Sequence, residues 1–133
     1  MSIKVYEKDK IFQRATVAGW RPMQGTQINI QGIDFAFCPS KKNKDVTIDV
    51  FEIESGTLMV SVAIDIFALF GSSTRDKAIE LYKKEIATAV VSKINKFGIK
   101  KVKSEIERME KQMTSIFGER PEIVDLEEGS NEI

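Results

Sequence analysis

The sequence predicts an α+β protein with about six short, mostly antiparallel strands followed by two C-terminal helices. Apolar residues alternate with polar ones through the first half of the chain, and they recur at helical spacing through the second half. Because strands and helices occupy separate parts of the chain, an α/β arrangement is not expected. The chain has 133 residues, of which 42% are hydrophobic, which suits one domain. We expect this domain to span residues 1–118, with a flexible, disordered acidic tail over residues 119–133.

The first strands are predicted from an alternation of period two. Residues 3–6 form a short strand, and residues 11–19 form a second one with the odd-numbered side chains on its apolar face. The segment 19–25 has glycine at both ends and Pro22 inside, so we expect a loop there. Alternation resumes over residues 26–31, which predicts a third strand.

Gly32 interrupts the alternation before the next predicted strand. In that strand Ile33, Phe35 and Phe37 share one face. Residues 39–45 contain three lysines and a proline, and we expect a basic turn there.

The last two strands are predicted over residues 46–53 and 58–66. The apolar alternation slips at Val50 and Phe51, which indicates a β-bulge. Residues 54–57 are typical of a hairpin turn. In the final strand five alternating apolar residues are expected on the core face: Leu58, Val60, Val62, Ile64 and Ile66.

The two helices follow residue 71. Ser72, Ser73 and Thr74 are good N-cap residues, and apolar residues recur at helical spacing over residues 79–94. Gly98 suits the position that ends a helix. We expect the second helix to fold back as a hairpin or to continue the first as one long kinked helix.

The second helix carries a heptad-like apolar seam. Its members are three and four residues apart: Ile99, Val102, Ile106, Met109, Met113 and Ile116. The seam is too short for a free coiled coil, so it must pack against something. One interpretation is packing within the fold, and the other is a two-fold contact between two copies of the chain. We expect a homo-oligomer, a dimer or larger.

Composition excludes several classes of protein. The chain has one cysteine, Cys38, and no histidine. An intrachain disulfide is therefore impossible, and a reducing cytoplasm is the natural location. The commonest general base and most zinc sites are also excluded. No apolar run is long enough for a membrane span, and no secretory signal is evident. We expect a cytoplasmic protein that is not an enzyme and has no metal or cofactor.

Charge is unevenly distributed along the chain. Residues 119–133 hold six acidic residues against one arginine, a net charge of −5, so the rest of the chain carries +5. A mildly basic domain is compatible with an anionic ligand or partner. The excess is smaller than nucleic-acid-binding domains usually show.

Two segments predict contact with an anion. The first joins the hydroxyl residues Ser72, Ser73 and Thr74 to Arg75 and Lys77 at a helix N-terminus, where phosphate or carboxylate groups bind favourably. An ordinary helix cap explains the same residues.

The second segment is a run of lysines around the expected helix junction: Lys93, Lys96, Lys100, Lys101 and Lys103. It suits phosphate or an acidic protein face, and it equally suits a solvated helix end.

Two further features of the sequence are candidate sites. Trp20, Arg21 and Met23 are residue types that interfaces favour, although a tryptophan folded onto the sheet is equally consistent. An enzyme is a further alternative, because two carboxylates on one face of the sheet could perform acid–base chemistry. The candidates are Asp34, Asp49, Glu52 and Asp65. Polar residues on an open sheet face give the same pattern. Cys38 is expected to be a small buried hydrophobic residue.

The order of a small sheet and two helices resembles that of some small phage proteins that sequester nucleotide signals, and equally that of other compact binding modules. The leading hypothesis is a non-enzymatic binding protein that self-associates through its C-terminal helices. It would capture a nucleotide-like anion or an acidic surface with Arg75, Lys77, Lys96 and Lys100. The alternative is a protein–protein inhibitor or adaptor of phage or plasmid type that acts through the Trp20 segment or a helix face.

Overall fold

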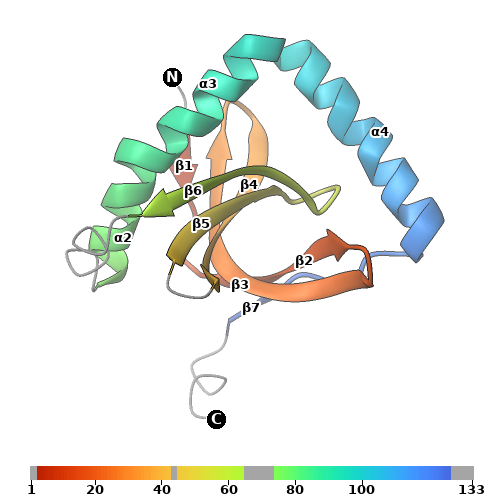
Figure 1. Cartoon of the computed structure of the whole chain (residues 1–133), viewed down its shortest axis with the longest axis horizontal. Helices are drawn as coiled ribbons and strands as arrows, with labels where there is room; N and C mark the ends of the chain where they lie inside the picture. The colour runs from red at the N-terminus through yellow and green to blue at the C-terminus, as the bar shows by residue number, and fades with distance from the viewer. Residues whose placement is uncertain (1–2, 43–44, 65–73, 127–133) are drawn as a thin grey trace.

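A computed structural model describes residues 3–42, 45–64 and 74–126. It confirms the α+β class: a strongly bent antiparallel sheet is followed by two helical arms (Figure 1). The strand order is β6-β5-β4-β3-β2-β7, and β1 pairs with β3. The elements are β1 (Ile3–Val5), β2 (Lys10–Thr16), β3 (Gly19–Ile30), β4 (Ile33–Lys42), β5 (Asp45–Glu52), β6 (Thr57–Ile64), α2 (Arg75–Leu81), the π-helical segment η1 (Tyr82–Ile86), α3 (Ala87–Phe97), α4 (Ile99–Phe117) and β7 (Val124–Asp125).

The main core lies between one face of the sheet and the first helical arm. Ile33, Phe35 and Phe37 of β4 point into it, as their spacing predicts. They pack against four buried side chains from η1 and α3: Tyr82, Ile86, Val90 and Ile94. The ring centroids of Phe37 and Tyr82 are 5.4 Å apart. Burial of this apolar area holds the helix against the sheet.

The expected loop over residues 19–25 is wrong, because these residues form the first half of β3. This half pairs with β2, and the second half pairs with β4 and β1. Pro22 is tolerated because β3 pairs there with β2 on one side only. Gly25 sits where β3 passes β4 so closely that a Cβ would lie 2.6 Å from the Cys38 sulfur. Glycine and proline thus mark a bend and an edge within one strand.

A second, smaller core lies on the other face of the sheet, where β2 and the first half of β3 fold over β4 and β5. It contains Phe12, Ala36, Cys38 and Phe51. The expectation that the odd-numbered residues of β2 form its apolar face is therefore wrong, since Phe12 is the buried residue. The central strands are buried on both faces, which period-two alternation does not reveal.

The predicted bulge at Val50 and Phe51 is confirmed, and the extra residue belongs to β6. Val50 pairs with Val60 and Phe51 pairs with Leu58, which leaves Met59 without a partner in the ladder. Leu58 is consequently 49% exposed, contrary to its expected place in the core, whereas Met59 packs against the main core. A bulge reverses which residues face inward.

The helical arms meet at Gly98, where they form a V (Figure 1). Thr74 caps the first arm by accepting a hydrogen bond from the Lys77 backbone N–H. Gly98 has a φ of 88°, a value that favours glycine, and the break is as predicted. Of the two alternatives, a fold-back hairpin and one long kinked helix, the open V is a sharply kinked helix and not a closed hairpin (Figure 1).

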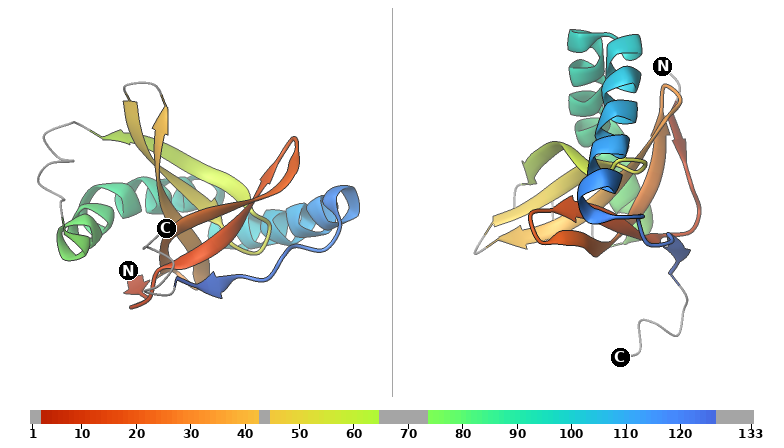
Figure 2. Two further views of the ribbon diagram at one scale, coloured as in Figure 1. Left: turned by 90° about the horizontal axis from the view of Figure 1, so that it is seen from below. Right: turned by 90° about the vertical axis from the view of Figure 1, so that its right-hand side faces the viewer.

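The second arm returns the chain to the sheet. After α4, Ile123 packs against the second core, β7 pairs with β2, and the Leu126 backbone N–H donates to the Asp9 carbonyl. The described part of the acidic segment therefore lies along β2 (Figure 2). Within the described residues, no helix has the length and apolar character needed to cross a membrane.

Candidate functional site

An apolar groove lies inside the V, between α3, α4 and the start of β6. Its volume is about 340 Å³. Apolar side chains from the three elements form most of its lining: Leu58, Met59, Phe97, Val102, Ile106 and Met109. Leu58 and Phe97 remain 49% and 47% exposed. Large apolar side chains gathered in a concave, accessible site are typical of a binding surface.

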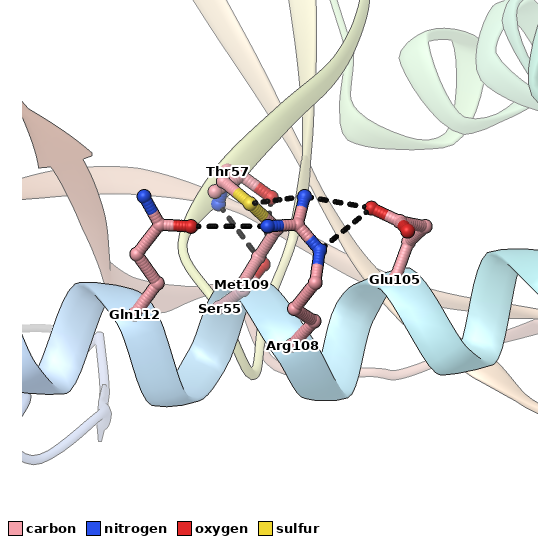
Figure 3. A network of polar contacts seen from close by, with 6 residues as sticks. All are labelled: Ser55, Thr57, Glu105, Arg108, Met109 and Gln112. Carbon is pink, nitrogen blue, oxygen red and sulfur yellow. Dashed lines mark hydrogen bonds and ion pairs between the residues drawn. The ribbon is translucent and has the colours of Figure 1, made fainter.

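Charged side chains also line the groove. Lys93 and Lys101 lie at the rim, and the Lys93 ammonium group donates to the Met59 carbonyl at 2.6 Å. Glu105 also lies there, but the Arg108 guanidinium pairs with it at 2.8 Å (Figure 3). The pKa of Glu105 is lowered by this hydrogen bond and charge. Arg108 is thus the main partner of Glu105, and the charge of Lys101 contributes less to its lowered pKa.

A hydrogen-bonded turn supports one wall of the groove. The Glu52 carboxylate accepts hydrogen bonds from the backbone N–H groups of Glu54 and Ser55, both at 2.8 Å, and from the Ser55 hydroxyl at 2.6 Å. The Ser55 hydroxyl in turn contacts that of Thr57 at 2.7 Å, beside Met109 (Figure 3). Burial raises the pKa of Glu52 although these hydrogen bonds oppose the shift. Glu52 shapes the turn and does not present a free carboxylate.

The predicted seam of α4 is divided between two environments. Ile99, Val102 and Ile106 pack against the main core, so half of the seam is used within the fold. Met109 and Met113 are half-buried, and Ile116 is 59% exposed. Self-association through this helix stays a prediction, with a smaller apolar surface than the sequence suggests.

In the predicted anion site at the start of α2, the arginine already has partners within the fold. Arg75 forms an ion pair with Asp9 at 3.0 Å and donates to the Tyr6 carbonyl at 3.0 Å. Thr74 caps the helix, Lys77 is exposed, and Ser72 and Ser73 lie outside the described residues. These contacts connect the start of α2 to the segment after β1. Anion binding there stays a prediction.

The structure places the lysine run at the apex of the V. Lys96 lies over the Phe97 ring at 5.6 Å. Lys100 and Lys103 lie on the other side of α4 in a polar cleft of about 500 Å³ that also contains Asp34, Glu54 and Glu107. Two of the five lysines therefore face acidic groups, whereas Lys93 and Lys101 face the apolar groove.

Of the predicted interface residues Trp20, Arg21 and Met23, two make contacts within the fold. The Trp20 indole N–H donates to the Gly118 carbonyl at 3.1 Å, and its ring meets Phe117 edge-on. Met23 packs against the second core, while Arg21 is exposed. The structure does not bring these residues to the groove.

Two of the predicted carboxylates, Asp34 and Glu52, line the same polar cleft beside α4, whereas Asp49 lies elsewhere. Asp49 is 1% exposed and accepts hydrogen bonds from Thr47 and Ser61, on the face that holds the second core. Glu52 lies opposite Phe35, a main-core residue, and therefore points to the other face. Asp34 accepts a hydrogen bond from Asn29, and Asp65 lies outside the described residues.

Cys38 is buried as predicted, being 1% exposed. Burial, with a contribution from Asp49, raises the pKa of its thiol to about 12. Such a thiol is inert at neutral pH. Over the described part of the chain, no group of three or more His, Cys, Asp or Glu residues could hold a metal ion.

Sequence reasoning missed the β6 wall of the groove. Alternation alone predicts Leu58 on the core face, and the bulge that turns Leu58 and Met59 depends on pairing with β5. The signal for Phe97 was available, because it is an aromatic residue between lysines at a helix end. Comparisons of the chain with protein-family models, curated proteins and solved structures give no match.

Proposed function

We propose that this chain is a non-enzymatic interaction module that binds an acidic, apolar-faced segment of a partner protein in the groove between α3, α4 and β6. The observation that carries the proposal is the exposure of Leu58 and Phe97 in a concave apolar site with lysines at its rim. An amphipathic helix laid into an apolar groove is a common mode of peptide recognition.

Charge favours an acidic partner. Residues 86–104 contain five lysines and no acidic residue, and Lys93 and Lys101 of this run line the groove. Glutamates on the polar side of a bound segment would meet these ammonium groups, while its apolar side would cover Phe97 and Leu58. Such complementarity selects the partner and accelerates association more than it raises affinity.

Methionines suit this role. Met59 and Met109 lie on opposite walls of the groove. Their unbranched side chains adapt to different apolar surfaces without branched-chain clashes. The site therefore has the properties of a recognition surface.

The test uses two designed amphipathic helical peptides, one with leucine and glutamate faces and one with leucine and lysine faces, each carrying a fluorophore. Fluorescence anisotropy should show binding of the glutamate peptide and weaker binding at high salt. Lys101→Glu should weaken it about tenfold, a change of about 1.4 kcal/mol. Phe97→Glu, at an exposed position, should abolish binding.

Lys111→Glu is the matched control, because Lys111 lies on α4 but does not line the groove. It should leave the affinity unchanged. Equal binding of the two peptides would contradict the proposal, and so would full affinity in the Phe97→Glu variant.

A further inference from the structure

Strand β6 forms one border of the sheet. The strand order ends with β6 on one side and with the two-residue β7 on the other. Over the described residues, no strand pairs with the outer side of β6, and Figures 1 and 2 show it at the border of the sheet. The outer backbone groups of an edge strand are a template for another strand.

The composition of β6 does not protect this edge. Its eight residues, Thr57–Ile64, include no charged residue, no proline and no glycine. The other borders carry such residues or are short. β7 contains Asp125, three-residue β1 contains Lys4, and the part of β2 beyond β7 contains Arg14. The half of β3 that pairs only with β2 contains Arg21 and Pro22. Edge strands normally carry such features, because they block pairing with other chains. Among the border strands described, β6 is thus the one that lacks these protective features.

The two ends of β6 differ in whether their outer backbone groups are available for pairing. The bulge at Met59 disrupts the first part of the strand, and the Lys93 ammonium group donates a hydrogen bond to the Met59 carbonyl at 2.6 Å. Val60 to Ile64 continue in regular register with β5 beyond the bulge. The groove and the open edge are thus neighbouring but separate parts of β6.

We propose that Val60 to Ile64 pair in antiparallel fashion with the same strand of a second copy, forming a dimer with one continuous sheet. The strand is neutral, so it does not repel its own copy. Val60, Val62 and Ile64 pack against the main core but stay half-buried, and a second β6 beside them would cover their open side. On the other face, Ser61 and Ala63 are small and exposed, so they leave room for the approach.

A two-fold axis normal to the sheet keeps the helices of both copies on one face. The two grooves would then lie on the same side of the dimer, although the pairing itself does not depend on what the grooves bind. A partner with two acidic segments would gain affinity from both sites.

The test introduces a positive or a negative charge at Ala63, which is exposed and points away from the main core. Native mass spectrometry and sedimentation velocity should show a dimer for the unmodified chain. Self-pairing of Val60–Ile64 centres on Val62, so the two Ala63 side chains lie diagonal to each other on one face of the sheet. Ala63→Lys alone and Ala63→Glu alone should each raise the dissociation constant about tenfold or more, because long side chains of like charge come within reach of each other at this diagonal position. Mixing the two variants should restore a dimer that contains one chain of each.

Circular dichroism should show that both variants fold. Phe97→Glu serves as the groove control and should leave the dimer intact, so that a failure of the peptide experiment and a failure of this one are distinguishable. A chain that stays monomeric at high concentration would overturn the proposal. A dimer unaffected by either Ala63 charge would overturn it too and would direct attention to Met113 and Ile116 on α4.

Discussion

Trp20 and Gly118 are 98 residues apart in the chain and are joined by a hydrogen bond, since the indole N–H donates to the Gly118 carbonyl at 3.1 Å. The ring also meets Phe117 edge-on at 6.2 Å, and it lies so close to Gly56 that a Cβ there would be 2.7 Å away. Trp20 therefore connects the end of α4 to the β5–β6 turn. Arg120 strengthens this connection by donating to the Ile53 carbonyl. With the first half of its seam on the core, α4 is fixed at both ends, which holds the groove open.

We expect Trp20→Ala to destabilise the protein by about 2–3 kcal/mol, because it removes a large, half-buried aromatic contact. Trp20→Phe keeps a ring against Phe117 and loses the hydrogen bond, so its loss should be about 1 kcal/mol. Urea unfolding followed by circular dichroism measures both. Equal stability of the two variants would show that the ring contact contributes nothing.

Gly25→Ala should destabilise the protein by about 2–3 kcal/mol, because the added methyl group meets the Cys38 sulfur and the Phe37 carbonyl oxygen, both at 2.6 Å. Gly32→Ala is the comparison. Its nearest neighbour is the Lys103 ammonium nitrogen at 3.6 Å, so it should lose only about 1 kcal/mol through its positive φ. Thermal unfolding would rank the two. A Gly32 variant that is the less stable one would contradict the close approach of β3 and β4.

Glu52 should make stability depend on pH. Burial raises its pKa in the folded state above the ordinary value of 4.5, so the folded state holds this proton more tightly than the unfolded state. The resulting contribution to stability is present below pH 4.5 and is lost as the pH rises through the folded-state pKa. As the pH rises from 4.5 through the folded-state pKa of Glu52, the free energy of unfolding of the unmodified protein should therefore fall relative to that of Glu52→Gln.

Urea unfolding at a series of pH values tests this dependence. Glu110→Gln is the control, because Glu110 is an exposed carboxylate on α4 and does not contribute to the raised pKa of Glu52. It should follow the unmodified protein throughout. A stability difference between the unmodified protein and Glu52→Gln that is constant with pH would contradict the role of burial.

Local sequence patterns determined the elements that depend on neighbouring residues. The helix break at Gly98, the cap at Thr74, the face shared by Ile33, Phe35 and Phe37, and the place of the bulge all follow from spacing and residue type. Each depends on residues close in sequence, so the chain alone carries the information.

Only the tertiary structure decided which of these surfaces remain available. Whether the α4 seam faces the core or a partner depends on the direction of the chain after Gly98. The exposure of Leu58 depends on which strand takes the extra residue, and the length of β3 depends on the approach of its backbone to Cys38. Long-range packing settles these outcomes, because the free energy of burying a side chain depends on what lies opposite it and not on its neighbours in sequence.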